Sequence, residues 1–171
     1  MEPLIQVTLY VDASFLPEIG EGFGCLIWQV NGAGQSREGE RFVRLGSLRD
    51  SMNAEFRILE HALRHLRDRV LRGISPRRAQ LQVWTDNMSV FRSLNGMEMP
   101  PAQPTLSRFY REVRCMLQRY QHYQVGRKDR EENPAGVALE GWISRYRDSE
   151  EFRQKQLQMM VRNNRRRPCH F

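Results

Sequence analysis

The amino-terminal part of the chain alternates between hydrophobic and polar side chains, which is the pattern of β-strands with one buried face. It predicts strands at residues 4–12, 23–30 and 38–45, with a turn from residue 17 to residue 24 between the first two. In the first strand the hydrophobic face consists of Ile5, Val7, Leu9 and Val11. Asn31-Gly32, after the second strand, is a dipeptide typical of tight hairpins. The chain is therefore expected to open with three antiparallel strands.

A helical pattern follows these strands. Hydrophobic residues recur at three- and four-residue steps, at Phe56, Leu59, Leu63, Leu66 and Val70, until residues 73–76 end the helix. Either Ser51 or Asn53 is expected to cap its start. Glu55 lies one turn before Leu59, at the edge of the apolar stripe, where an acidic residue is either a partner of the helix dipole or a metal ligand.

The second half of the chain alternates between strands and helices. The expected elements are a strand at 81–86 with apolar residues on both faces, a short helix reaching residue 94, a loop at 97–104, a helix at 106–120, a strand at 122–125 and a helix from 134 or 135 to about 163. This order predicts an α/β domain with a mixed sheet and a central parallel strand. We expect one domain over residues 1–145, then a helical extension and basic tail over 146–171.

Charge changes the picture more than composition does. The chain has 171 residues, a net charge of +7, and only two lysines, Lys128 and Lys155, among its basic residues. A coding bias toward Arg would explain the Arg:Lys ratio but not the net charge. A basic excess points to nucleic acid or an acidic membrane surface. The basic run Arg165-Arg166-Arg167 is expected to begin a mobile tail.

The remaining gross features favour a cytoplasmic protein. No apolar run reaches membrane-spanning length, and no signal peptide is recognised at the start. The three cysteines, Cys25, Cys115 and Cys169, are odd in number and far apart, which is typical of reduced thiols and not of a disulfide frame or a zinc site. A monomer without membrane contact is expected.

Three acidic residues stand where hydrophobic segments turn polar: Asp12, Glu55 and Asp86. Alone, each of the two aspartates is a common turn former at a strand end. Together, the three carboxylates form the set of oxygen ligands that a hard divalent cation requires. Two such cations side by side catalyse phosphodiester cleavage. The three residues are therefore the candidate metal ligands and catalytic residues.

Five segments in this order resemble type 1 ribonuclease H, a family of the ribonuclease-H-like fold. They are Asp-Ala-Ser at 12–14, Gly-Phe-Gly-Cys-Leu-Ile at 22–27, Asn-Ala-Glu at 53–55, Thr-Asp-Asn-Met-Ser-Val at 85–90, and the stretch from Val125-Gly126-Arg127 to Asn133. The resemblance covers about residues 4 to 142. It implies a five-stranded sheet of order 3-2-1-4-5 with helices on both faces. It also implies hydrolysis of the RNA strand of RNA–DNA hybrids with Mg²⁺ or Mn²⁺ at a two-metal site.

The chain departs from this family at one catalytic position. The family places a fourth acid four residues after the Asn of its last motif, and here that residue is Val137. Three substitutes are open: Glu140 one turn later, Asp129 or Glu132 in the preceding loop, or water and substrate phosphate alone. One metal subsite is therefore expected to be weak. Arg127 or Lys128 stands near the place of the family's loop histidine.

The resemblance also implies substrate contacts, at Ser14, Asn53, Asn87, Arg127, Lys128, Arg130 and Asn133. Helix capping is an alternative role for Asn53 and Asn87. Arg108, Arg111 and Arg114 form either a phosphate rail or a solvated face.

Other residue pairs with site-like spacing are interpreted as structural. His61 and His65 have the spacing of metal ligands, but a solvated face is favoured because no third ligand accompanies them. Trp28, Trp84 and Trp142 are expected in the core.

Two further functions remain open beside the nuclease. One is a catalytically weak or inactive nucleic-acid-binding module on the same fold, which Val137 favours. The other is a different nuclease of the superfamily, such as a junction resolvase.

Overall fold

The five predicted strands form one mixed sheet in the computed structural model, which describes residues 4–32 and 34–165. The strands are β1 Ile5–Leu16, β2 Glu21–Gly32, β3 Gln35–Ser47, β4 Ala79–Thr85 and β5 His122–Arg127. Their order is β3-β2-β1-β4-β5. The first three are antiparallel, and β4 runs parallel to both β1 and β5. The predicted α/β class and sheet order are confirmed.

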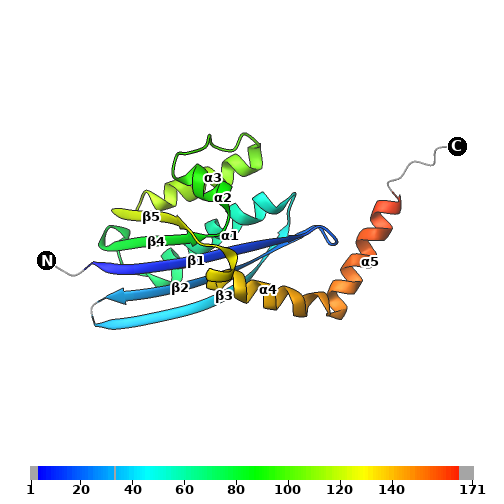
Figure 1. Ribbon diagram of the computed structural model, residues 1–171, viewed down its shortest axis with the longest axis horizontal. Helices are drawn as coiled ribbons and strands as arrows, with labels where there is room; N and C mark the ends of the chain where they lie inside the picture. The colour runs from blue at the N-terminus through cyan, green and yellow to red at the C-terminus, as the bar shows by residue number, and fades with distance from the viewer. Residues whose placement is uncertain (1–3, 33, 166–171) are drawn as a thin grey trace.

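Helices lie on both faces of this sheet. They are α1 Ser51–His65, α2 Met88–Leu94, α3 Pro104–Leu117, α4 Pro134–Arg147 and α5 Glu150–Arg165. A π-helical turn, η1 Leu66–Val70, continues α1, and two short 3-10 turns, η2 Pro76–Arg78 and η3 Arg130–Glu132, precede β4 and α4. Figure 1 shows α1, α2 and α3 gathered on one side of the sheet, with α5 extending away beyond α4.

The alternation of side chains in β1 and β2 divides the interior into two cores. Val7, Leu9 and Val11 of β1 belong to the larger core, which α1 and α3 cover. Phe23 and Cys25 of β2 belong to the smaller core on the α4 side. Because each strand buries alternate residues on opposite faces, the sheet needs a helical layer on both sides.

The turn before β2 is shorter than predicted. Gly22 and Gly24 lie inside β2, because the strand pairing continues to Leu16 and Glu21. A Cβ atom on Gly24 would lie 2.5 Å from the Ile58 side chain of α1. The glycines therefore allow α1 to lie close to β2 and do not mark a turn.

The last predicted helix is two helices. The chain breaks at Asp148 and Ser149, between α4 and α5. The Ser149 Oγ accepts a hydrogen bond from the Phe152 backbone N at 3.2 Å, which starts the new helix. Phe152 is buried with its ring 5.6 Å from that of Tyr146. The apolar contact and the cap together redirect the chain.

The prediction that the three tryptophans lie in the core is confirmed only in part: Trp28 packs against the larger core and Trp142 against the smaller one. Trp28, Trp84 and Trp142 are all half-buried. Trp84 stands on the face of β4 that alternates with the buried face, together with the half-buried Gln80 and Gln82. The strand therefore buries only one of its faces fully. The sequence had predicted a central parallel strand with both faces apolar.

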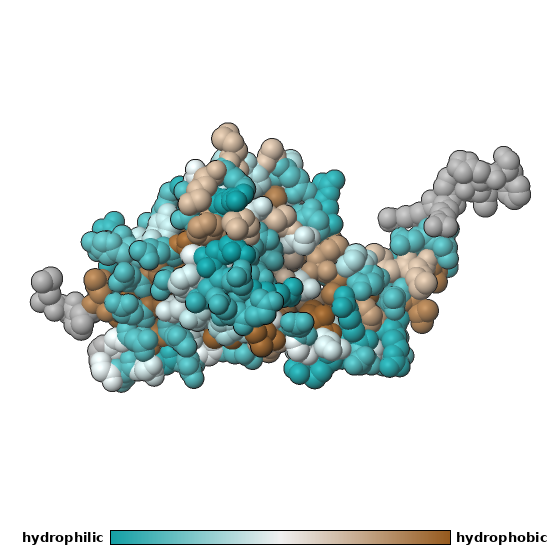
Figure 2. Space-filling model, in the orientation of Figure 1, coloured by the Kyte–Doolittle hydropathy of each residue, from teal (hydrophilic) through white to brown (hydrophobic). Residues whose placement is uncertain are grey.

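The visible surface is mainly hydrophilic. Figure 2 shows this, with apolar side chains along α5. Three exposed apolar residues of α5 are Leu157, Met160 and Val161. Among the described residues no helix is both long and apolar enough to cross a membrane. Arg166, Arg167 and Cys169 of the expected tail lie outside the described residues, and Cys25 and Cys115 are free thiols.

Candidate metal centre

Two aspartates meet where β1 and β4 diverge. These strands run parallel and pair up to Tyr10 and Trp84, so that the residues two positions further, Asp12 and Asp86, leave the last pair together. β4 ends at Thr85, whereas β1 continues in its pairing with β2. Asp86 is therefore released from the sheet beside the carboxylate of Asp12.

Glu55 reaches the same point from the second turn of α1. The helix is capped by Asp50, whose side chain accepts a hydrogen bond from the Asn53 backbone N at 2.9 Å. The sequence prediction of Ser51 or Asn53 as the cap was wrong, because Asp50 begins the helix one residue earlier. Close packing of α1 on the glycines of β2 brings Glu55 toward β1. Its side chain is buried although it is acidic.

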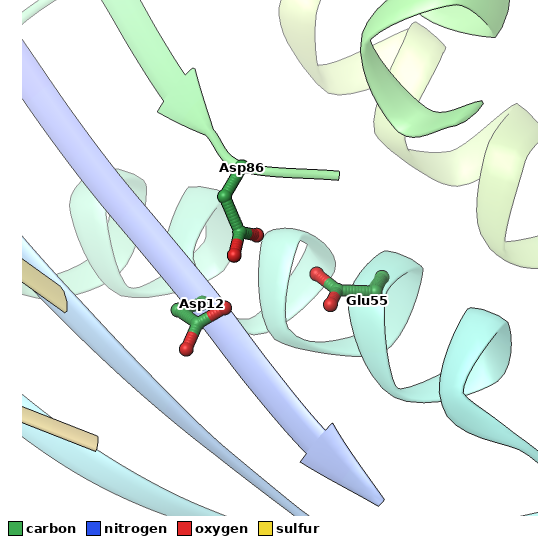
Figure 3. Close-up of side chains that lie close together, drawn as sticks. All are labelled: Asp12, Glu55 and Asp86. Carbon is green, nitrogen blue, oxygen red and sulfur yellow. The ribbon is translucent and has the colours of Figure 1, made fainter. Parts of the chain in front are cut away.

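The three carboxylates form one cluster (Figure 3). One ligand oxygen of each residue, Asp12, Glu55 and Asp86, lies within 4.8 Å of the others. No other group of three or more His, Cys, Asp or Glu residues in the described ranges has this geometry. Asp12 is 1% exposed and Glu55 8% exposed, while Asp86 is half-buried. The proximity expected from the sequence is present.

The cluster needs positive charge. Burial, together with the charge of Asp86, raises the pKa of Asp12 to about 7, although the charge of Arg130 opposes this shift. Burial also raises the pKa of Glu55 well above its usual range, with Asp12 and Asp86 adding to it. One carboxylate oxygen of Glu55, Oε2, is buried with no hydrogen-bond partner. A hard divalent cation would supply the missing charge and the missing partner, so these residues fit one.

One arginine already lies against the cluster. The Arg130 Nη2 is 3.3 Å from the Asp12 Oδ2. This guanidinium is 46% exposed, while the carboxylate it contacts is 1% exposed. The ion pair thus partly neutralises Asp12 from the solvent side and leaves the rest of the arginine accessible.

The first turn of α4 lies beside Asp12. A Cβ atom on Gly136 would be 3.5 Å from the Asp12 Oδ2, so the first turn of α4 faces this carboxylate. Val137 follows it and is 55% exposed. Glu140, one turn later, shares a pocket of about 480 Å³ with Ser14 and Arg130.

The two loop acids are less well placed as substitutes. Asp129 forms an ion pair with Arg127, with the Arg127 Nη2 2.7 Å from the Asp129 Oδ1. Glu132 is exposed, in the η3 turn. Of these three acids, Glu140 is the one that lines a pocket together with Arg130 and Ser14.

The expected substrate-contacting amides have structural partners. The Asn133 Oδ1 caps α4 by accepting a hydrogen bond from the Ala135 backbone N at 3.2 Å, and the Asn133 Nδ2 donates to the Val11 carbonyl at 2.9 Å. Asn87 caps α2, accepting from the Val90 backbone N at 2.9 Å. Capping, the alternative open for Asn87, is thus its observed role.

Asn53 is not a helix cap. It is 1% exposed, and its Nδ2 donates to the Asp50 Oδ1 at 2.9 Å. Its Oδ1 is buried without a partner. The sequence did not indicate Gln103, which accepts a second bond from this amide at 3.4 Å.

Lys128 lies over an aromatic ring that sequence reasoning had assigned to the core. Its Nζ is 4.5 Å from the centre of the Trp84 ring. The Lys128 backbone N donates to the Thr85 carbonyl at 3.0 Å, which holds the end of β5 beside the end of β4. The spacing of Trp84 two residues before Asp86 could have indicated an aromatic beside the metal centre.

Comparison with known proteins supports the fold. No protein-family model and no curated protein matches the sequence. Similar solved structures include RNase H1 from the archaeon Halobacterium salinarum, with 20% identity over 78% of this chain and 93% of the other, and a TM-score of 0.57. The N-terminal RNase H domain of a Mycobacterium tuberculosis protein has 16% identity over 83% and 99%, with a TM-score of 0.56.

A third similar structure is LC11-RNase H1 in complex with an RNA/DNA hybrid. It has 17% identity over 75% of this chain and 88% of the other, with a TM-score of 0.53. At these identities the likeness establishes a ribonuclease-H-like fold.

Proposed function

We propose that this chain is a metal-dependent endoribonuclease that hydrolyses the RNA strand of RNA–DNA hybrids. The observation that carries the proposal is the cluster of Asp12, Glu55 and Asp86, with oxygens within 4.8 Å of one another, at the divergence of β1 and β4. Three repelling carboxylates are costly in a protein that binds a polyanion, unless a cation joins them. The net charge of +7 and the hybrid bound to LC11-RNase H1 support the substrate class.

The chain's own residues supply ligands and orientation. Asp12, Glu55 and Asp86 would hold Mg²⁺ or Mn²⁺. When bound, the cation supplies Lewis-acid stabilisation of phosphate charge and lowers the pKa of water. Arg130 presents planar donors beside Asp12, and a phosphate oxygen fits such donors. Lys128, exposed Arg127 and Ser14 are the proposed contacts to the nucleic-acid backbone.

Glu140 is the proposed substitute for the fourth acid. It is exposed on the same pocket as Arg130, where its carboxylate can accept a proton from the attacking water. Water would form the new bond to phosphorus as the bond to the 3′ oxygen breaks. The products would be a 5′-phosphate and a 3′-hydroxyl. Selectivity for RNA would come from helix shape and 2′-hydroxyl contacts and not from base sequence.

The test is cleavage of an end-labelled hybrid with Mn²⁺ and with Mg²⁺. Single-stranded RNA and duplex DNA of the same sequence are the substrate controls, and an identically purified Asp12→Asn protein controls for contaminating nucleases. We expect internal cuts in the RNA of the hybrid alone, faster with Mn²⁺. Cleavage that persists in Asp12→Asn would overturn the assignment.

A binding module without catalysis is the second candidate. Two observations favour it: Val137 at the fourth-acid position, and the Arg130 guanidinium already paired with Asp12. Hybrid binding without cleavage under either metal would support this candidate.

We also propose that the protein acts as a monomer in the cytoplasm. The free thiols Cys25 and Cys115 support a reducing compartment. Light scattering at working concentration tests the monomer, and a second species of twice the mass would contradict it.

A further inference from the structure

A second polar pocket lies where the carboxyl-terminal half of α1 passes β3. Its volume is about 170 Å³, and none of the carboxylates of the metal centre lines it. Its polar lining consists of Arg41, His61, Arg64, His65, Asp68 and Arg69. His61 and His65, expected on a solvated face, are half-buried here. The two histidines share the pocket with arginines from β3, α1 and η1.

Two of the charged lining residues are already balanced. Asp68 is paired with its neighbour Arg67, with Nη2 and Oδ2 2.9 Å apart. Arg64 is paired with Glu60 at 2.9 Å and with Glu112 at 3.1 Å. These groups therefore add little net charge to the pocket.

The two other arginines leave positive charge unbalanced. Arg41 and Arg69 form no ion pair with any carboxylate in residues 4–32 and 34–165. Both act on His65, whose pKa is lowered by burial and then by these two charges. The pKa of His61 is also lowered, first by burial and then by the charges of Arg57, Arg41 and Arg64. The pocket thus combines two imidazoles whose protonated form is disfavoured and two arginines that form no ion pair, and Asp68 is the one carboxylate that lines it among the described residues; this balance is unfavourable for a metal cation and favourable for an anion.

The contact between Arg41 and His65 determines which ring nitrogen of His65 carries the proton. The Arg41 Nη1 lies 3.3 Å from the His65 Nδ1. Because a guanidinium can only donate, Nδ1 must accept, and the ring proton is on Nε2. His65 therefore retains an N–H donor in addition to those of Arg41 and Arg69.

We propose that this pocket binds a tetrahedral oxyanion of the phosphate class, held by Arg41, Arg69 and His65. Arginine forks match phosphate oxygens in geometry and charge. About 170 Å³ is well below the roughly 300–1,000 Å³ of pockets for drug-sized ligands, so it accepts one phosphoryl group and not a whole nucleotide. The phosphoryl group comes either from free phosphate or from a phosphodiester of nucleic acid. The proposal is independent of catalysis at the carboxylate cluster.

Histidine ring NMR tests the proposal on the intact protein. Sodium phosphate is titrated at constant ionic strength against sodium chloride, and the ring signals of His61 and His65 are followed. His122, exposed on β5 and outside the pocket, is the internal reference. We expect saturable shifts of His61 and His65 with phosphate, a rise in the pKa of His65, and no such change for His122. Equal responses to chloride and phosphate would overturn the proposal.

Single substitutions locate the anion. Arg41→Gln and Arg69→Gln should each weaken phosphate binding about five-fold or more, because each removes one full charge next to the anion. Arg145→Gln, an exposed arginine on α4, is the matched control and should bind phosphate like the original protein. An unchanged affinity in both pocket variants, or saturable binding of Zn²⁺ by His61 and His65 in place of phosphate, would refute the anion site.

A second arm separates the two phosphate sources. A short RNA–DNA hybrid is added in place of sodium phosphate. If the hybrid shifts the signals of His61 and His65 and Arg41→Gln removes that shift, the anion is a phosphodiester. If only sodium phosphate shifts them, the pocket takes a free or terminal phosphate. If neither does, no oxyanion site exists here.

Discussion

At the scale of single residues, the cluster of Asp12, Glu55 and Asp86 holds like charges together in a largely buried site. Asp12 and Glu55 are nearly inaccessible, yet Arg130 is the one cation in the described chain that is paired with either. Buried carboxylates without a full set of counter-charges destabilise a folded protein. A divalent cation bound by these carboxylates would therefore stabilise the folded protein.

Asp12→Asn separates folding from function. In chelator, the variant should melt at a higher temperature than the original protein, because one of three repelling carboxylates is gone. Adding Mn²⁺ should raise the melting temperature of the original protein and leave that of Asp12→Asn nearly unchanged, since a bound ligand stabilises only the state that binds it. Scanning calorimetry measures both. Equal Mn²⁺ stabilisation of the two proteins would show that the ion binds elsewhere.

Val137→Asp tests the missing fourth acid. The side chain is 55% exposed, so a carboxylate there has little desolvation cost. It should raise the rate of hybrid cleavage with Mg²⁺ by roughly ten-fold or more, which corresponds to about 1.4 kcal/mol of barrier. Val137→Asn is the matched control, because Asn has nearly the same shape as Asp but no charge. Initial rates with Mg²⁺ and Mn²⁺ are the readout.

Glu140→Gln completes this comparison. If Glu140 fills the role, its loss should reduce the original rate by about ten-fold or more and have a smaller effect in the Val137→Asp background. Additive losses in the two backgrounds would show that Glu140 acts independently of the fourth-acid position. An unchanged rate in both would exclude Glu140.

The sequence predicted the proximity of the three acids but not their surroundings. Asp12 and Asp86 were found because strand periodicity marks the ends of strands. The contact of Arg130 with Asp12 joins residues 118 positions apart, through a loop whose path no local pattern specifies. The Lys128–Trp84 contact was missed for the same reason, since it depends on how β5 ends beside β4.

At the scale of elements, α1 determines where Glu55 lies, and its start is set by Asp50. The carboxylate accepts bonds from the Asn53 backbone N and Nδ2, both at 2.9 Å. Asp50 was overlooked because Ser51 and Asn53 are equally common caps. The break at Ser149 was overlooked because α4 and α5 share a continuous helical composition.

Asp50→Ala should lower the free energy of unfolding by about 1 kcal/mol at neutral pH, through loss of the cap. The bond from Asn53 lowers the pKa of Asp50 below its ordinary value of 3.8. A carboxylate whose pKa is depressed by folding stabilises the protein above the unfolded value and loses that effect as pH falls through the folded value. The difference between the two proteins should therefore shrink below pH 3.8. Urea unfolding at a series of pH values measures it.

Asp50→Asn is the control for this pH dependence. The amide oxygen can still accept the bond from Asn53, and Asn caps about as well as Asp. This variant should lose little stability at neutral pH. A large loss would show that the charge matters more than the cap.

Gly24→Ala tests the close approach of α1 to β2. The new Cβ would lie 2.5 Å from Ile58, so Ile58 and α1 must shift, at a cost of about 1–3 kcal/mol. Cleavage should fall as well, because the shift displaces Glu55. Gly141→Ala is the matched control: its Cβ meets only Arg145 at 3.7 Å, and it should stabilise α4 by about 0.5–1 kcal/mol. Urea unfolding and initial rates compare them.

At the scale of the whole molecule, the net charge of +7 does not say which cations are free to bind a polyanion. Ion pairs tie α5 to the sheet region: Glu151 pairs with Arg44, and Lys155 pairs with Glu21 at 2.7 Å. The sequence gives the net charge but not this pairing, which depends on the fold. Which arginines can meet a polyanion therefore follows from structure alone.

The expected phosphate rail on α3 illustrates this limit. Arg114 donates to the Leu94 carbonyl at 3.1 Å, and Arg108 lies over the Phe109 ring and 3.6 Å from Glu112. Arg111 is exposed and has no ion pair within the described ranges. Of the three arginines, Arg111 is thus the most available to a phosphate.

Neutralising Arg108, Arg111 and Arg114 together tests whether this face binds nucleic acid. Each phosphate contact contributes about 0.9 to the slope of log affinity against log salt on B-form duplex, so loss of one to three contacts should flatten the slope by about 1–3. Because Arg108 and Arg114 have partners within the protein, we expect a value near the lower limit, most of it reproduced by Arg111→Gln alone. Fluorescence anisotropy of a labelled hybrid in chelator, over a range of salt concentrations, measures the slope without cleavage.

The double variant Arg72→Gln/Arg77→Gln is the control for this experiment. It removes exposed arginines that precede β4, at the end of that strand opposite Asp86, and should leave the slope unchanged. Equal slopes for the original and the triple variant would mean that this face is solvated and that the polyanion is bound elsewhere, either by Lys128 and the arginines around Asp12 or by the pocket of Arg41 and Arg69.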